Sequence, residues 1–271
     1  MKLKTLMGDH AVTQAFKRNT SLFDFADVKA PATAFKRVVR ALEFDVAELA
    51  IVTFLLARAH GKPLKLLPAV VMARFQHPYL VYNAERGALS PKELNGKRVG
   101  LRSYSVTTSA WIRGILADDF GVDLDRIKWV TFEEPHVAEF RDPPNVERAP
   151  AGKEMLAMLR AGELDAAIVG AIPEDAGFKP VIADPEAAAK AWRKKHGAIQ
   201  INHMVTVKYT VDSSTAAQIY EQLKKSREAA GNPEMNPFGV EENRRNLEVA
   251  IDCVYRQKMI PRRFTVEELF E

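Results

Sequence analysis

Short apolar runs alternate with segments whose apolar residues recur every three to four positions along most of the chain. Short runs bounded by polar, glycine or proline residues are typical of strands, and the longer spacing is typical of amphipathic helices. The predicted strands are residues 3–7, 44–50, 64–72, 79–83, 98–101, 127–132, 164–169 and 199–207. The predicted helices are 35–42, 53–60, 107–120, 153–161 and 185–196, with two more beginning at Ser213 and Glu241. This alternation predicts an α/β fold whose mainly parallel sheets are flanked by helices.

Local signals mark several element boundaries. Ser90-Pro91-Lys92-Glu93 has the pattern of a capping box, with proline in the first helical position. Gly61 and Gly121 end two of the predicted helices. Residues 133–152 are rich in proline and charge and show no periodicity, so we predict a loop or lid there.

The length of 271 residues suits two modest domains. We expect a two-lobed fold with a cleft between the lobes. Residues 1–97 and 200–271 would form the first lobe and residues 98–199 the second, with chain crossings near Lys97 and Ile199. Ligands of such sheets bind outside the carboxyl ends of the strands, where loops and helix N-termini converge.

The composition excludes several classes of protein. The net charge is only +4, and the densest basic stretches, residues 193–195 and 262–263, carry no interleaved aromatic residues, so we expect no nucleic-acid partner. The single cysteine, Cys253, excludes an internal disulfide and is expected to be a buried core thiol. No run approaches the roughly 18 apolar residues that span a bilayer, so we expect no membrane partner. The N-terminal residues contain no apolar signal core, which predicts a cytoplasmic protein.

A polar loop and helix start follow the predicted strand 98–101. Hydroxyl groups crowd there beside the backbone N–H groups of a helix N-terminus, whose dipole favours an anion. The guanidinium of an arginine can bind a carboxylate through two hydrogen bonds, and a tryptophan adds an aromatic face. The alternative is an ordinary helix cap with a packing tryptophan, but the convergence of donors favours an anion site. The residues predicted to contact substrate here are Arg102, Ser103, Tyr104, Ser105, Thr107, Thr108, Trp111 and Arg113.

A second candidate follows the predicted strand 64–72. Arg74, Phe75 and His77 supply a cation, an aromatic ring and an imidazole, a combination that suits recognition of an aromatic acid. The alternative is a surface turn before Pro78. The residue types do not decide between the two.

Glu48 lies inside a predicted strand, on the same face as Phe44 and Val46. A carboxylate on that apolar face is costly unless paired, and burial would raise its pKa, as a general acid requires. The alternative is a structural salt bridge to an arginine.

Asp9 and His10 directly follow the first predicted strand, and His203 lies on a late strand near the predicted second crossing. Asp9 and His203 join Glu48 and His77 as predicted catalytic groups. A metal site assembled from Asp9, His10, Glu48, His77 and His203 is conceivable, but their spacing along the chain does not predict one. We expect no cofactor, and a divalent metal requirement stays open.

Several short sequence motifs between residues 44 and 207 occur in an order that is typical of one protein family. They are Phe44-Asp45-Val46-Ala47-Glu48, Arg74-Phe75-Gln76-His77, Leu94-Asn95-Gly96-Lys97-Arg98-Val99-Gly100, Trp111-Ile112-Arg113-Gly114-Ile115-Leu116, Gly162-Glu163-Leu164-Asp165-Ala166 and the strand that carries His203. In this order they resemble the 4,5-dihydroxyphthalate decarboxylase family. The chain departs from that family in the loop 103–108, which reads Ser-Tyr-Ser-Val-Thr-Thr where Glu-Tyr-Gln is expected before the threonine.

The resemblance implies a type 2 periplasmic-binding-protein fold, solute-binding-protein-like, with a cleft between its two lobes. It further implies a cytoplasmic aromatic acid decarboxylase that acts on a hydroxylated benzene carboxylate. Arg102 or Arg113 would hold a carboxylate, while Trp111 and Phe75 would sandwich the ring. His77, His203 or Glu48 would donate the proton to the ring carbon, and Asp9 or another carboxylate would polarise a ring hydroxyl.

Two other functions stay open. A solute-binding or sensor protein for an anionic small molecule would show the same lobes and the same helix start. A pyrimidine-synthesising relative of the fold carries a cysteine-rich motif, which has no counterpart around Cys253. A homodimer is the default for an enzyme of this kind.

Overall fold

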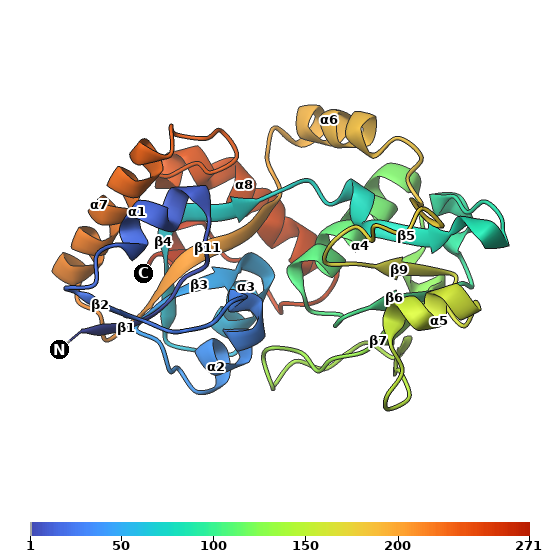
Figure 1. Cartoon of the computed structure of the whole chain (residues 1–271), viewed down its shortest axis with the longest axis horizontal. Coiled ribbons are helices and arrows are strands. Elements are labelled where there is room, and N and C mark those ends of the chain that lie inside the picture. Colours follow the sequence, from blue (N-terminus) through green and yellow to red (C-terminus); the bar gives the residue numbers. More distant parts are fainter. Residues whose placement is uncertain (1) are drawn as a thin grey trace. The chain divides into compact units, whose positions relative to one another are not determined.

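A computed structural model describes residues 2–271, which form two compact units (Figure 1). The first unit contains the chain up to Arg74, residues 136–139 and residues 198–271. The second contains residues 75–135 and 140–197. The first crossing therefore lies after Arg74 and not near Lys97 as predicted. Residues 75–97 belong to the second unit because the strand within them pairs with strands of that unit.

The first unit is built on a five-stranded sheet. Its elements are β1 (Leu3–Leu6), α1 (Gln14–Lys17), β2 (Phe23–Phe25), α2 (Phe35–Arg40), β3 (Val46–Ala50), α3 (Ile51–Ala59), β4 (Leu64–Ala73), β11 (Ile201–Lys208), α7 (Ser213–Ala229) and α8 (Val240–Arg256). The strand order is β2-β1-β3-β11-β4. β1 is parallel to β2 and β3, whereas β11 is antiparallel to β3 and β4, so the sheet is mixed.

The core of the first unit lies between this sheet and the helices that pack on it. On α7, Ala216, Ile219 and Leu223 form a buried stripe at helical spacing, packed with Phe16 of α1 and Val46 of β3. α3 packs against β3 and α8. Cys253 of α8 is buried, as predicted.

The second unit is built on a six-stranded sheet. Its elements are β5 (Leu80–Asn83), β6 (Arg98–Leu101), α4 (Thr107–Phe120), β7 (Lys128–Thr131), β8 (Val146–Arg148), α5 (Met155–Ala161), β9 (Ala166–Ile168), β10 (Phe178–Pro180) and α6 (Pro185–His196). The strand order is β10-β5-β9-β6-β7-β8. β9, β6, β7 and β8 run parallel, and β5 is antiparallel to β9 and β10.

Several predicted boundaries in the second unit are confirmed. Ser90 and Glu93 form the predicted capping box, here on a single 3-10 turn. α4 begins at Thr107 and ends at Gly121, whose φ of 64° is left-handed and suits glycine. The predicted irregular segment 133–152 is wrong in one part, because β8 lies inside it and pairs with β7.

The strand directions bring particular residues to one edge of each sheet. In the first unit, the carboxyl ends of β1 and β3 lie beside the start of β11, because β11 is antiparallel to β3. In the second unit, the carboxyl ends of β6 and β9 lie beside the start of β5. These edges are where α/β sheets carry their ligand sites.

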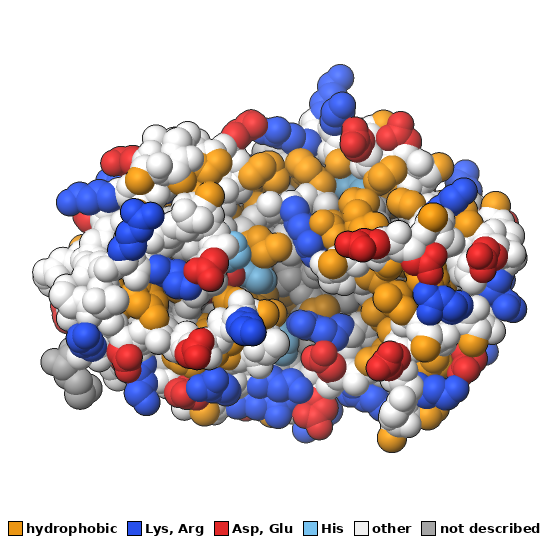
Figure 2. Space-filling model, viewed as in Figure 1, with side chains coloured by type: hydrophobic (Ala, Val, Ile, Leu, Met, Phe, Trp, Pro, Cys, Tyr) orange, Lys and Arg blue, Asp and Glu red, His pale blue; other side chains and the backbone are white. Residues whose placement is uncertain are grey.

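The surface gives a weaker guide to function. Figure 2 shows basic and acidic side chains intermingled over the face in view, in keeping with the net charge of +4. Within residues 2–271, no helix combines the length and the apolar character needed to cross a bilayer.

Candidate functional site

Glu48 is the centre of a cluster with two histidines in the first unit. Its Oε1 lies 2.8 Å from Nε2 of His10 and 2.5 Å from Nδ1 of His203. Its Oε2 accepts a hydrogen bond of 2.7 Å from the backbone N–H of Gly8. The Glu48 side chain is 1% exposed, whereas those of His10 and His203 are 24% and 15% exposed. The carboxylate is therefore buried beneath two imidazoles that reach solvent.

The sheet register explains why these residues meet. Val205 is paired with Glu48 across β11 and β3, so His203 is the diagonal neighbour of Glu48 on the same face. Gly8 and His10 come from the loop that follows β1, the other neighbour of β3. The end of β3, the start of β11 and the loop after β1 all lie at the sheet edge described under the fold.

The pKa of Glu48 is lowered well below its ordinary value. Burial by itself raises this pKa, but hydrogen bonds from His10 and His203 and the favourable charge interactions with both rings outweigh it. Because the ionised carboxylate only accepts hydrogen bonds, Nε2 of His10 and Nδ1 of His203 carry the protons of these contacts. The prediction that burial would make Glu48 a general acid is therefore wrong, and the arginine partner considered as its alternative is replaced by histidines.

Asp9 lies outside this cluster, although it was predicted to act in catalysis. Its side chain is 80% exposed and pairs with Lys17 at 2.5 Å. His10, one residue later, occupies the site instead. The sequence feature that could have identified His10 is its position directly after the first strand. The backbone turns there, so the side chains of Asp9 and His10 point to different sides.

The close contact of Gly8 with Glu48 gives a testable prediction. A Cβ atom at residue 8 would lie 2.8 Å from both Oε2 of Glu48 and Nε2 of His10. The Gly8→Ala variant should therefore displace the cluster without removing any of its side chains. We expect a changed His10 or His203 imidazole signal in NMR and loss of any ligand binding by the unit. Gly61→Ala serves as a control for general destabilisation, because its left-handed φ of 70° strains an alanine although no side chain lies near it. Identical imidazole spectra for Gly8→Ala and wild type would contradict the prediction.

His77 is the most unusual of the predicted residues in the second unit. It begins the 3-10 turn His77–Tyr79 before β5 and is fully buried. Among residues 2–271, neither of its ring nitrogens has a hydrogen-bond partner. Burial lowers the pKa of His77 to about 4, against a weaker opposing effect of Asp119, so the ring is neutral at neutral pH. A buried polar group in this state is a candidate ligand contact.

Aromatic side chains surround this part of the second unit. The ring of Phe75 lies 6.3 Å from that of His77 and 6.1 Å from that of Trp192 on α6. Trp192 also contacts Trp111 of α4 edge to face, with centroids 5.8 Å apart. Phe75 and Trp111, predicted to sandwich a substrate ring, are thus linked through Trp192 and belong to one aromatic cluster.

Arg113 is buried in the core of the second unit. Its guanidinium lies 3.6 Å from the centroid of the Tyr104 ring and 5.9 Å from that of Trp129. Stacking on aromatic faces is a stable arrangement for a buried arginine. This geometry accounts for Tyr104 and Arg113 as packing partners, and their predicted contact with substrate stays a prediction.

The other residues predicted to contact substrate around the start of α4 differ in burial, and their contact with a ligand stays a prediction. Ser103, Ser105 and Thr107 are buried, and the hydroxyl oxygens of Ser103 and Ser105 are 3.4 Å apart. Thr108 is partly exposed. Arg102 forms a long ion pair of 3.7 Å with Glu133. Arg74 ends the first segment of the first unit, and its backbone N–H bonds to the carbonyl of Gln200.

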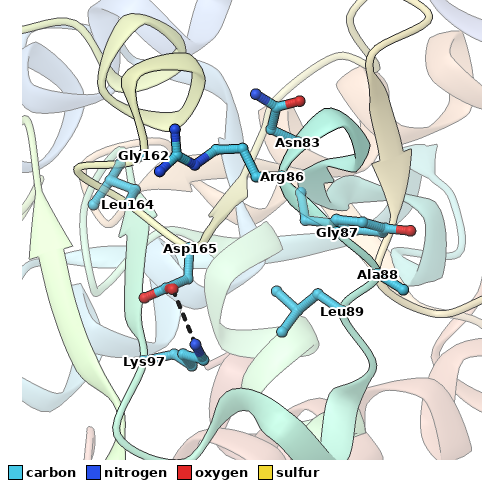
Figure 3. Close-up of a pocket in the computed structure, with 10 residues that line it drawn as sticks. Asn83, Arg86, Gly87, Ala88, Leu89, Lys97, Gly162, Leu164 and Asp165 are labelled. Carbon is cyan, nitrogen blue, oxygen red and sulfur yellow. Dashed lines mark ion pairs between the residues drawn. The ribbon is translucent and has the colours of Figure 1, made fainter.

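A separate pocket of about 240 Å³ lies elsewhere in the second unit (Figure 3). Its lining includes Arg86, Lys97 and Asp165, with Lys97 and Asp165 paired at 3.3 Å. Lys97 and Asp165 directly precede β6 and β9, so this pocket is at the opposite edge of the sheet from the strands' carboxyl ends. Its position and its paired charges make it a weaker candidate than the Glu48 cluster.

The chain resembles known proteins in sequence. Residues 28–141 match a family model described as NMT1/THI5 like. The 4,5-dihydroxyphthalate decarboxylase of Comamonas testosteroni is 30% identical over 194 residues, covering 67% of this chain and 59% of that protein. The protein of the same name from Pseudomonas putida is 31% identical over 175 residues, covering 60% of this chain and 68% of that protein. The match thus spans less than two thirds of the Comamonas relative.

Solved structures show the same fold at low sequence identity. The alkanesulfonate-binding protein SsuA from Xanthomonas axonopodis pv. citri, bound to MOPS, aligns with a TM-score of 0.57 and 15% identity over 99% of this chain and 97% of that one. The periplasmic aliphatic sulphonate binding protein SsuA from Escherichia coli aligns with a TM-score of 0.58 and 12% identity over the same shares. The predicted periplasmic-binding-protein-like fold is confirmed. From the identity to the two curated relatives, this chain belongs to the 4,5-dihydroxyphthalate decarboxylase family.

Proposed function

We propose that the chain is a decarboxylase of a hydroxylated aromatic carboxylate, resembling 4,5-dihydroxyphthalate, with the His10–Glu48–His203 cluster as its reacting centre. The single observation that carries the proposal is the buried, ionised Glu48 held between two partly exposed imidazoles. Perturbed ionisable groups of this kind are concentrated at functional sites. Both relatives that establish the family carry the decarboxylase name.

The reaction has two requirements. A proton must reach the ring carbon that bears the departing carboxylate, while a ring hydroxyl ortho or para to that carbon gives up its own proton and becomes the carbonyl of a dienone. The C–C bond then breaks, carbon dioxide leaves, and the electron pair of that bond restores the aromatic ring as a phenolate, which takes its proton back. The protein must therefore supply one proton to the ring carbon at a fixed position and return another to the phenolate oxygen.

The histidines of the cluster suit this role better than Glu48. Glu48 is ionised and already accepts three hydrogen bonds, so it orients the imidazoles and has no proton to give. Its contacts leave Nδ1 of His10 and Nε2 of His203 pointing away from the carboxylate. A histidine oriented by a buried carboxylate through one nitrogen and acting through the other is a common general acid–base arrangement.

The second unit has candidate ligand contacts of its own, and we propose that His77 and the aromatic cluster bind an aromatic ligand. His77 is neutral and can donate one hydrogen bond and accept another. Phe75 and Trp111 offer apolar faces, and the hydroxyls before α4 offer donors for a carboxylate.

A substrate panel tests the proposal. The purified protein is incubated with hydroxylated phthalates and benzoates while carbon dioxide release and ring absorbance are followed, with and without added divalent metal. We expect carbon dioxide from at least one member with a hydroxyl ortho or para to a carboxylate, and none from phthalate itself, which lacks the hydroxyl. Turnover of phthalate at the same rate would contradict the proposed electron path.

The second candidate function is binding of an anionic small molecule without chemistry. The observation in its favour is the structural similarity, over 99% of this chain, to two sulfonate-binding proteins. Tight binding of a panel member in calorimetry, with no carbon dioxide over many hours, would support it over the decarboxylase.

A further inference from the structure

We propose that His10, Glu48 and His203 bind one divalent first-row transition metal ion. The ligand atoms would be Nε2 of His10, Nδ1 of His203 and Oε1 of Glu48. One ring nitrogen of each histidine and one carboxylate oxygen of Glu48 all lie within 4.8 Å of one another. The ion would serve the reaction proposed above, and to that extent the inference rests on it, but the binding itself does not.

The donor set points to the class of ion. Two imidazoles and one carboxylate are the protein ligands of many catalytic zinc sites and of non-haem iron sites, which keep positions open for water or substrate. Nitrogen donors disfavour Mg²⁺ and Ca²⁺, which prefer oxygen. We therefore expect Zn²⁺, Co²⁺, Mn²⁺ or Fe²⁺ at this site and not the hard cations.

The charge balance of the cluster also favours a cation. Glu48 is buried and ionised, and in the described part of the chain its two ion-pair partners are both histidines. If both rings are neutral, one negative charge is left buried, which is costly. A proton on one ring or a divalent ion between the three side chains would offset that charge.

The surroundings hold the carboxylate in a suitable position. The N–H of Gly8 binds Oε2, which leaves Oε1 directed at the two imidazoles, and such outer contacts orient the ligands of metal sites. The ring of Phe35 packs edge to face on His203, with centroids 5.2 Å apart. His10 and His203 are each partly exposed, so an ion has a route from solvent.

Binding requires only small movements. Two ligands of a tetrahedral ion with bonds of about 2.0–2.1 Å lie about 3.3 Å apart, and those of an octahedral ion lie about 3.0 Å apart. The present separations from Oε1 are 2.8 and 2.5 Å, so each ring nitrogen must move away from Oε1 by less than about 1 Å. The ring nitrogens of the two histidines, which lie within 4.8 Å of each other, must reach about the same spacing. The protons on Nε2 of His10 and Nδ1 of His203 must also leave, to the opposite ring nitrogen if the ring is neutral or to solvent if it is cationic.

This proton movement connects the ion with the proposed chemistry. The ion would fix the remaining protons on Nδ1 of His10 and Nε2 of His203, the nitrogens assigned to proton transfer. The charge of the ion would also make these N–H groups more acidic.

The test measures ion binding directly. The protein is stripped with a chelator, then titrated with Zn²⁺, Co²⁺, Mn²⁺ and Mg²⁺ by calorimetry, with Co²⁺ followed by its visible absorption. We expect one transition metal ion per chain with nitrogen-ligand bands for Co²⁺, and no comparable binding of Mg²⁺. In His10→Ala, His203→Ala and Glu48→Gln, the Zn²⁺ affinity should fall at least about 100-fold.

The control is His60→Ala, which removes an exposed histidine of the same unit outside the cluster and should bind like wild type. Circular dichroism verifies folding of each variant, and the wild-type titration is decisive even if one variant fails to fold. Absence of binding tighter than about 100 µM, or binding that survives all three substitutions, would overturn the proposal.

The outcomes separate this inference from the proposed function. A bound ion lost in the variants, with no turnover of any panel member, supports the metal site and contradicts the decarboxylase. Turnover by stripped protein in excess chelator supports the decarboxylase and removes the ion from its mechanism.

Discussion

The Glu48→Gln variant should lose nearly all turnover of any substrate that the wild-type protein decarboxylates, by at least about 100-fold. Glutamine has nearly the same shape but no charge, and it presents one acceptor oxygen where the carboxylate accepts hydrogen bonds from Gly8, His10 and His203. Its amide N–H₂ must then face another donor unless an imidazole changes its tautomer. We expect the free energy of unfolding to fall by about 1–3 kcal/mol, measured by urea denaturation at pH 7.

The matched control is Glu43→Gln, at an exposed ion pair with Arg37 in the same unit. This variant makes the same chemical change where solvent replaces the lost partner, so turnover and unfolding midpoint should stay close to those of wild type. Turnover of Glu48→Gln within tenfold of wild type would remove the cluster from the reaction, whatever its effect on stability.

The elements with strong patterns were predictable from sequence. α4 combines a polar start, apolar positions at helical spacing and Gly121 in the left-handed conformation at its end, so both boundaries were correct. β2, β8 and β10 were missed because each has only three residues and at least one of them is charged, so no apolar run shows. β9 is equally short but was predicted, because it lies in the apolar run 166–169. The direction of β11 was not predictable either, because a strand's pattern is the same in parallel and antiparallel pairs.

The reacting centre could be predicted only in part. Glu48 and His203 were identified from their places on strands, but 155 positions separate them along the chain, and only the register of β11 with β3 brings them together. The sign of the pKa shift of Glu48 depends on the same pairing. The sequence predicts only that Glu48 is buried, and burial alone would raise the pKa of its carboxyl group. The two histidine contacts reverse the outcome.

Glu48 and His77 illustrate opposite ways of burying an ionisable group. Glu48 has three hydrogen-bond donors and stays charged, so its contacts contribute to stability. His77 has no hydrogen-bond partner among the residues that the structure describes and stays neutral. A group that the folded chain leaves unsatisfied costs stability, so removing it should have a different signature from removing Glu48.

The His77→Leu variant should therefore be at least as stable as wild type at pH 7 while losing at least about tenfold in substrate binding or turnover. The leucine leaves no hydrogen bond of the folded chain unmade, since neither ring nitrogen of His77 makes one. A ligand that bonds to this imidazole would lose that contact. Urea denaturation and calorimetry with the best panel member measure the two effects.

Acidification sharpens the distinction. The pKa of His77 is about 4 in the folded protein and about 6.5 in an unfolded chain, so between these values the unfolded state binds more protons. Protonation of His77 in the unfolded chain therefore lowers the free energy of unfolding as the pH falls from 6.5 towards 4, by about 2 kcal/mol at pH 5. His77→Leu lacks this group and should lose correspondingly less stability between pH 7 and pH 5 than wild type. His60→Leu, which changes an exposed histidine, should follow the wild-type pH dependence. If His77→Leu instead loses stability at pH 7 and keeps the wild-type acid sensitivity, His77 is a packing residue and its assignment to ligand recognition is wrong.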